Sequence, residues 1–167
     1  MGLLSFIKDA GEKLFGGKEV EQAAATAAAD PAQQPNLEAL NAKAAAAIQT
    51  YIETQNLGLT ALSVGFDGGT GKVTVRGQAP TQEASEKVTL CCGNVASVQN
   101  VENLLAVSEP ADEAQYHDVA RGDTLSAIAK TYYGNANKYM AIFEANKPML
   151  SHPDKIYPGQ MLRIPPL

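Results

Sequence analysis

Cysteine is nearly absent from this chain of 167 residues, and its only two cysteines, Cys91 and Cys92, are adjacent. Neighbouring residues in a helix point their side chains in different directions, so we expect no disulfide between them. A cysteine-based metal site needs spaced ligands such as C-x-x-C, which the sequence lacks. The two residues are therefore predicted to serve as small apolar side chains in or near a core.

An excess of positive charge is also missing, because the chain has 13 lysines and arginines and 18 aspartates and glutamates, which gives a net charge of −5. A mildly acidic chain without a basic stripe argues against nucleic acid or an anionic membrane as the main partner. No apolar run is long enough to span a membrane. The first apolar run is interrupted by Lys8 and Asp9, unlike a secretory signal. We therefore expect a cytoplasmic protein.

Motifs of catalysis are absent as well. The sequence contains no G-x-S-x-G nucleophile motif, and His117 and His152 are isolated from other metal-ligating residues. The segment "GFDGGTGKV" at 65–73 lacks the first glycine and the Ser or Thr of a phosphate-binding loop, so we predict a hairpin there. We expect a protein that is not an enzyme.

Composition divides the chain into five segments. Residues 1–16 carry apolar side chains at helical spacing, and this amphipathic segment is predicted to pack on the adjoining domain. The alanine-rich residues 17–35 have no apolar stripe and are predicted to form a linker. Two small domains should follow, at 36–108 and 116–167, separated by the polar, acidic linker 109–115.

Local patterns predict an α+β fold in both domains. Helical stripes, alternating strands and turn residues give the order α-β-β-α-β for the first domain and β-α-α-β for the second. The expected elements of the first are a helix capped by Asn36, strands 62–66 and 72–77, a helix from Thr81 to a left-handed Gly93, and strand 101–107. Those of the second are strand "YHDV", a helix capped by Asp123 or Thr124, a helix containing Ile142 and Phe143, and strand "MLRI".

Several ordered motifs in the second domain resemble a LysM domain: "YHDVARGDTLSAIA", "YGNAN", "IFEAN" and "IYPGQMLRIP". The first domain is similar to a BON domain, through "VTVRG" and "GNVASVQNV". With the leading pattern "MGL..F.KDAGEKL", the chain as a whole resembles the bacterial potassium-binding protein Kbp family. The resemblance implies a soluble cytoplasmic protein that binds K⁺ selectively, with Rb⁺ and Cs⁺ as substitutes, and changes conformation on binding. It also suits a potassium sensor in osmotic stress, with a contact between BON and LysM.

The same resemblance suggests where the ion binds. Neutral backbone carbonyls hold K⁺ well, whereas carboxylate clusters favour Ca²⁺ or Mg²⁺. Unpaired carbonyls at helix C-termini, at the negative end of the helix dipole, are suitable ligands, although water or a Schellman bond can satisfy them equally. Matched to the family pattern, the expected ligands are the carbonyls of Ile7, Ala10, Glu12, Gly93, Val95 and Val98. An ion bound by both groups would order the N-terminal segment against BON.

Two other functions remain open from the sequence. LysM domains bind glycans that contain N-acetylglucosamine, so the alternative is an envelope protein that binds peptidoglycan through LysM and phospholipid through BON. A protein–protein scaffold is the third interpretation. By motif match, the glycan groove would have Gly122, Asp123, Thr124 and Leu125 on one wall and the stretch from Asn146 to Leu150 on the other. These residues would also cap a helix and fill a small core.

Overall fold

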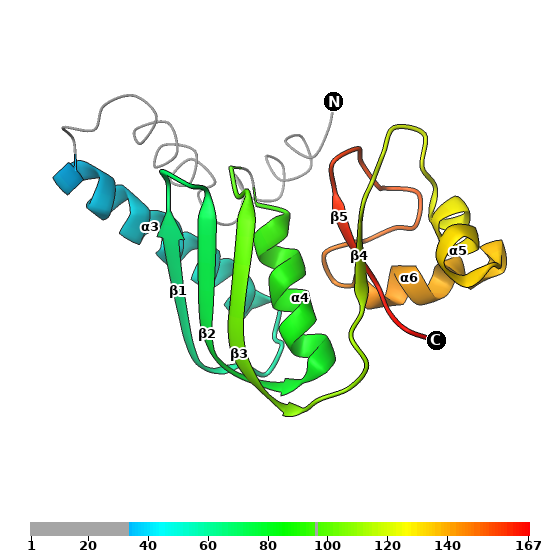
Figure 1. The fold of residues 1–167 in the computed structure, drawn as a ribbon, viewed down its shortest axis with the longest axis horizontal. Coiled ribbons are helices and arrows are strands. Elements are labelled where there is room, and N and C mark those ends of the chain that lie inside the picture. Colours follow the sequence, from blue (N-terminus) through cyan, green and yellow to red (C-terminus); the bar gives the residue numbers. More distant parts are fainter. Residues whose placement is uncertain (1–33, 96) are drawn as a thin grey trace.

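Two α+β units make up the part of the chain that the computed structural model describes, residues 34–95 and 97–167 (Figure 1). The predicted segment 1–16 and residues 17–33 of the predicted linker lie outside these residues. In the first unit a three-stranded sheet, ordered β1-β2-β3, pairs β1 with β2 antiparallel and β2 with β3 parallel. Its elements are α3 (Gln34–Thr54), β1 (Thr60–Asp67), β2 (Lys72–Thr81), α4 (Gln82–Gly93) and β3 (Asn100–Glu109). The predicted order is confirmed, and each strand is somewhat longer than predicted.

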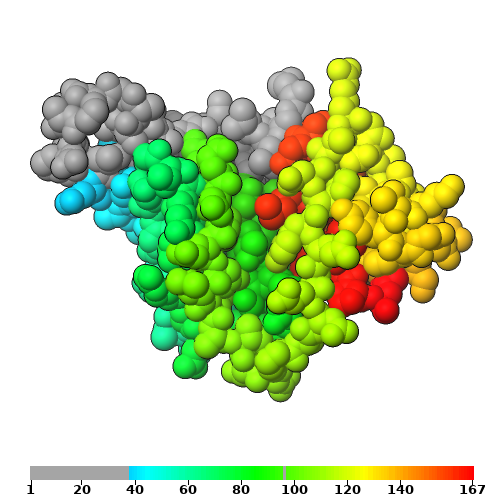
Figure 2. All heavy atoms as spheres, in the orientation of Figure 1, coloured from blue at the N-terminus to red at the C-terminus, as the bar shows by residue number. Residues whose placement is uncertain are grey.

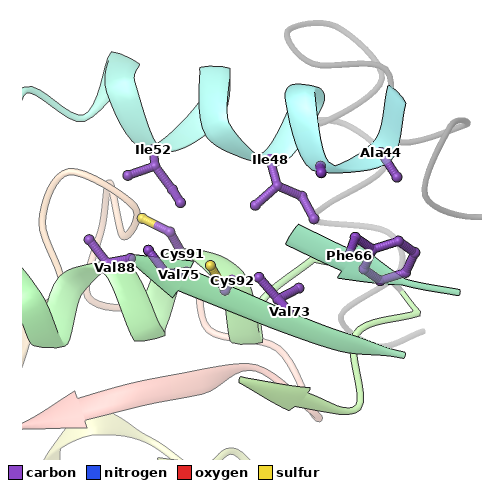
Figure 3. Packing of buried hydrophobic residues seen from close by; sticks show 10 residues of the cluster. Ala44, Ile48, Ile52, Phe66, Val73, Val75, Val88, Cys91 and Cys92 are labelled. Atoms are coloured by element: carbon purple, nitrogen blue, oxygen red, sulfur yellow. The ribbon is translucent and has the colours of Figure 1, made fainter. Parts of the chain in front are cut away.

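The core of the first unit lies between the sheet and its two helices (Figure 3). Alternation along β2 places Val73 and Val75, both fully buried, on the side that faces the helices. Ile48 and Ile52 are four residues apart on α3, so they share one face of that helix and pack into the same cluster. The period of each element therefore decides which of its side chains enter the core.

Two helix boundaries differ from the prediction. Helix α3 begins at Gln34, so Asn36 lies inside the helix and not at its N-cap position. Pro35 fits the first turn because its missing N–H would have no helical partner there. Gly93 is the last helical residue of α4 and does not adopt a left-handed conformation; the C-cap is Asn94, with φ of −92°.

The second unit pairs β4 with β5 in an antiparallel two-stranded sheet, packed on two short helices. The predicted β-α-α-β order is confirmed, with one 3-10 turn added. Thr124, and not Asp123, is the N-cap, since the N–H of Ala127 donates to its hydroxyl at 3.1 Å. The elements are β4 (Gln115–Asp118), α5 (Leu125–Tyr133), η2 (Ala136–Lys138), α6 (Tyr139–Ala145) and β5 (Met161–Ile164).

Helix α4 lies between the three-stranded sheet and β5, so one helix contacts both units (Figure 1). The two units pack directly against each other in the space-filling view (Figure 2). Among the described residues, no helix has the length and apolar character needed to cross a membrane.

Candidate functional site

Three of the six expected K⁺ ligands, Gly93, Val95 and Val98, lie together where α4 ends and the chain turns into β3. The other three, Ile7, Ala10 and Glu12, lie outside the described residues. The turn places the last carbonyls of α4 at the negative end of the helix dipole. Within residues 34–95 and 97–167, no group of three or more acidic, His or Cys side chains that could hold a metal ion lies at this turn.

Backbone hydrogen bonds shape this turn. The N–H of Val95 donates to Cys92 O at 3.1 Å, and the N–H of Val98 donates to Val95 O at 3.2 Å. Ser97 has a φ of 69°, in the left-handed region that a serine rarely adopts. The carbonyl of Val95 thus accepts one hydrogen bond and keeps a second lone pair for another partner.

Asn94 connects this turn to the second unit. Its buried side-chain amide donates to Leu90 O and to Met161 O, both at 3.0 Å. Its Oδ1 accepts from the N–H of Met161 at 2.9 Å. The side chain therefore pairs with the backbone of β5 as a neighbouring strand would. A Cβ on Gly93 beside it would lie 2.8 Å from Met161 Sδ, so the flexible end of the Met161 side chain would have to move.

A buried ion pair joins the two units nearer the start of α4. Arg163 Nε lies 2.7 Å from Glu86 Oε2, and the side chains of Arg163 and Glu86 are only 8% and 7% exposed. The N–H of Ala114 donates to Glu86 Oε1 at 2.9 Å, so the linker 109–115 also contacts this carboxylate. Burial, and next the charge of Glu86, raise the pKa of Tyr116 on β4 to about 12.

A third contact between the two units involves the sulfur atoms of Cys91 and Met149. Cys91 and Cys92 are free and buried in the core of the first unit, as predicted. Met149 of the second unit packs against that core, with its Sδ 3.1 Å from Cys91 Sγ. Burial raises the pKa of Cys91 to about 12, and it also raises the pKa of Cys92. Both residues are neutral thiols near pH 7, so they act as apolar side chains.

The residues expected to line a glycan groove fall into two groups. Gly122 and Thr124 are exposed and Asp123 is half-buried, whereas Leu125, Asn146 and Leu150 are buried. The amide of Asn146 is fully engaged inside the second unit, where it donates to Ile142 O at 2.6 Å and to Arg163 O at 2.8 Å. Its Oδ1 accepts from the N–H of Arg163 at 2.8 Å. The side chain of Asn146 therefore has a structural role, and the glycan groove stays a prediction.

His117 is not as isolated as its sequence neighbours indicate. Its Nε2 lies 2.9 Å from Asp123 Oδ2, and its Nδ1 lies 3.2 Å from the hydroxyl of Tyr132. The hydrogen bond from His117, and next that from the N–H of Ala120, lower the pKa of the Asp123 carboxyl. The cluster joins β4, the following loop and α5. In residues 34–95 and 97–167, no group of three or more His, Cys, Asp or Glu side chains could hold a metal ion.

The lowered pKa of Asp123 predicts how stability depends on pH. A carboxyl group with a lowered folded-state pKa stabilises the fold above its ordinary pKa, near 4, and this contribution is lost as the pH falls through the lowered value. We expect Asp123→Asn to lower the free energy of unfolding by about 1 kcal/mol at pH 7. The difference in free energy of unfolding between variant and wild type should be smaller at pH 3. The wild type loses the contribution of Asp123 as the carboxyl is protonated, whereas the amide of the variant does not titrate. Urea unfolding at both pH values measures it, and an equal difference at both would contradict the prediction.

Comparisons with known proteins agree with this architecture. The BON domain model matches residues 41–109, and the LysM domain model matches residues 117–165. Potassium binding protein Kbp of Escherichia coli O6:H1 is 43% identical over 165 residues, which cover 99% of each chain. An uncharacterized protein of Deinococcus radiodurans is 49% identical over 49 residues, which cover 29% of this chain and 19% of that protein.

The fold and the matches define a two-domain protein of the BON–LysM class. With 43% identity over nearly its whole length, the chain belongs to the family of potassium binding protein Kbp. The turn after α4 lies in the BON domain, and β5 lies in the LysM domain. Sequence reasoning selected Gly93, Val95 and Val98 but missed Asn94 and Arg163. The only local sign of Asn94 was a polar residue after a helix, and nothing near it indicated a partner in LysM.

Proposed function

We propose that this protein binds K⁺ through backbone carbonyls, including those of Gly93, Val95 and Val98 at the C-terminal end of α4. The observation that supports the proposal is that Gly93, Val95 and Val98 lie in one turn at the C-terminal end of α4, which is the negative end of the helix dipole. Ligands of this neutral kind favour a large monovalent cation over Ca²⁺ or Mg²⁺. The name of its relative, potassium binding protein, supports the same ion. The function is binding, not catalysis.

The remaining ligands in this proposal are the carbonyls of Ile7, Ala10 and Glu12. An ion shared between them and the turn would tie the N-terminal segment to the BON domain, and Rb⁺ and Cs⁺ would substitute for K⁺. Because Asn94 lies inside the turn and holds β5, the ion would also stabilise the contact between BON and LysM. Such a change of conformation suits a cytoplasmic K⁺ sensor in osmotic stress.

Thermal unfolding of the full chain tests ion binding. Melts are compared in KCl, RbCl, NaCl and choline chloride at equal ionic strength, so that general screening is the same in all four. A ligand at a hundred times its Kd stabilises the folded state by about 2.7 kcal/mol. For a chain of this size that corresponds to a rise in Tm of roughly 5–10 °C. We expect this rise in KCl and RbCl but not in NaCl.

Equal melting temperatures in the four salts would contradict K⁺ binding. Retention of the protein on purified peptidoglycan would then favour the envelope function. A rise that is equal in KCl and NaCl would show a site for monovalent cations without the proposed selectivity. NMR spectra of the full chain in KCl and NaCl locate the response, which we expect at the amides of residues 93–95 and 97–99.

A further inference from the structure

The turn after α4 is held on a second side by the hairpin that joins β1 and β2. Gly71 is the last residue of that hairpin turn, directly before β2. Its carbonyl accepts from the N–H of Gln99 at 2.7 Å and from the N–H of Asn100 at 3.3 Å. Two successive backbone amides at the start of β3 therefore bind to one oxygen atom of the hairpin.

The contact is so close that only glycine fits at this position. A Cβ on residue 71 would lie 2.7 Å from the carbonyl oxygen of Ser97 and 2.8 Å from Gln99 Cγ. Ordinary contact begins at 3.4 Å, so the Ser97 carbonyl would have to move by about 0.7 Å, the difference between 3.4 and 2.7. That oxygen is a backbone atom, and it cannot move without the peptide that joins Ser97 to Val98.

Glycine is also required by the backbone conformation. Gly71 has a φ of 64°, and Ser97 opposite it has a φ of 69°. A side chain in this left-handed region is strained, so the serine keeps its conformation because surrounding contacts impose it. The two hydrogen bonds from Gln99 and Asn100 to Gly71 are such contacts.

We propose that Gly71 is a positioning residue of the ion site, which sets the spacing of the carbonyls of Val95 and Val98 and thereby the preference for K⁺ over Na⁺. The inference rests on the proposed function. The turn is held by Asn94 on one side and by Gly71 on the other. A turn fixed at both ends cannot contract around Na⁺, which is smaller than K⁺. A turn displaced at Gly71 holds its oxygen atoms in a different arrangement and loses this discrimination.

Calorimetric titration of the full chain with KCl and with NaCl, at constant ionic strength, tests the role of Gly71. In Gly71→Ala we expect K⁺ affinity to fall about tenfold, a change of about 1.4 kcal/mol. We expect the ratio of K⁺ to Na⁺ affinity to fall as well. A loss of folding stability alone would not change that ratio.

Two glycine variants serve as matched controls. Gly69→Ala changes the same hairpin, where a Cβ would meet only the side chain of Asp67, at 3.2 Å. Gly134→Ala introduces a side chain at a φ of 69° in the LysM domain, with nothing within 4 Å. We expect both to bind K⁺ within about twofold of wild type, although Gly134→Ala should have a lower melting temperature because of backbone strain.

Gly71→Asn separates displacement from strain, since asparagine tolerates the left-handed region but carries the same Cβ. We expect it to lose K⁺ affinity and selectivity as Gly71→Ala does, with less loss of stability. Wild-type affinity and selectivity in Gly71→Asn, or in Gly71→Ala, would overturn the positioning role while leaving K⁺ binding intact. Wild-type protein that shows no response to K⁺ would overturn the proposed function itself.

Discussion

Replacing Arg163 by methionine is expected to lower the free energy of unfolding by about 3–5 kcal/mol, because it leaves the Glu86 carboxylate buried without its charged partner. Arg163 and Glu86 are almost fully enclosed, and the distance between Nε and Oε2 is 2.7 Å. Water cannot replace the lost guanidinium at so buried a site. Urea unfolding followed by circular dichroism at pH 7 measures the loss.

An exposed ion pair of the same kind provides the control. Lys72 Nζ lies 3.1 Å from Glu102 Oε2 on the outer surface of the sheet, with side chains 40% and 42% exposed. Water screens the charges of an exposed pair, so Lys72→Met should have little effect on stability. The double variant Arg163→Met, Glu86→Leu removes both buried charges and should recover much of the stability that the single variant loses. An equal loss in Arg163→Met and Lys72→Met would contradict the importance of burial.

In the variant Asn94→Leu, we expect that K⁺ binding at the turn after α4 no longer affects the LysM domain. The change preserves approximate side-chain size but removes the partners of Met161 N–H and Met161 O. Each unpaired backbone group costs about 1–3 kcal/mol, so for two groups we expect a loss of roughly 2–6 kcal/mol in the stability of the contact between the domains. Because coupling between binding and docking is reciprocal, weaker docking should also weaken K⁺ binding.

NMR spectra of the full chain measure this coupling at the amides of β5. In wild type we expect the Met161 amide to shift when K⁺ replaces Na⁺, and in Asn94→Leu we expect little shift there. Asn100→Leu is a matched control, since Asn100 lies close to the same turn with an exposed side chain. An unchanged response of Met161 to K⁺ in Asn94→Leu would contradict a connection through Asn94.

Much of the fold could be predicted because it depends on residues that are close in the sequence. Alternation along β2 and the spacing of Ile48 and Ile52 on α3 specify strand and helix and also select the core side chains. Thr81 was predicted to begin α4, and its hydroxyl accepts from the N–H of Ala84 at 3.1 Å. Such a cap needs only neighbours within one turn.

Gly93 shows where local reasoning failed. A glycine at a helix end predicts a left-handed cap, but here the residue is helical, and the end of the Met161 side chain lies next to it. The surroundings of Gly93 therefore include a residue of the other domain, which no local pattern indicates. Asn146 has a contact that its motif did not indicate, since its amide is engaged with the backbone of β5, while the glycan groove stays a prediction.

The sequence by itself determined the family, the order of helices and strands, and the burial of Cys91 and Cys92. Periodicity and motif order are sufficient for these, because neither depends on how distant segments meet. Only the tertiary structure decided the partners of Asn94, Glu86 and Gly71. Asn94 binds β5 across 67 residues, and Glu86 binds Arg163 across 77. Contacts so far apart in the chain arise from the packing of two domains, which no local pattern records.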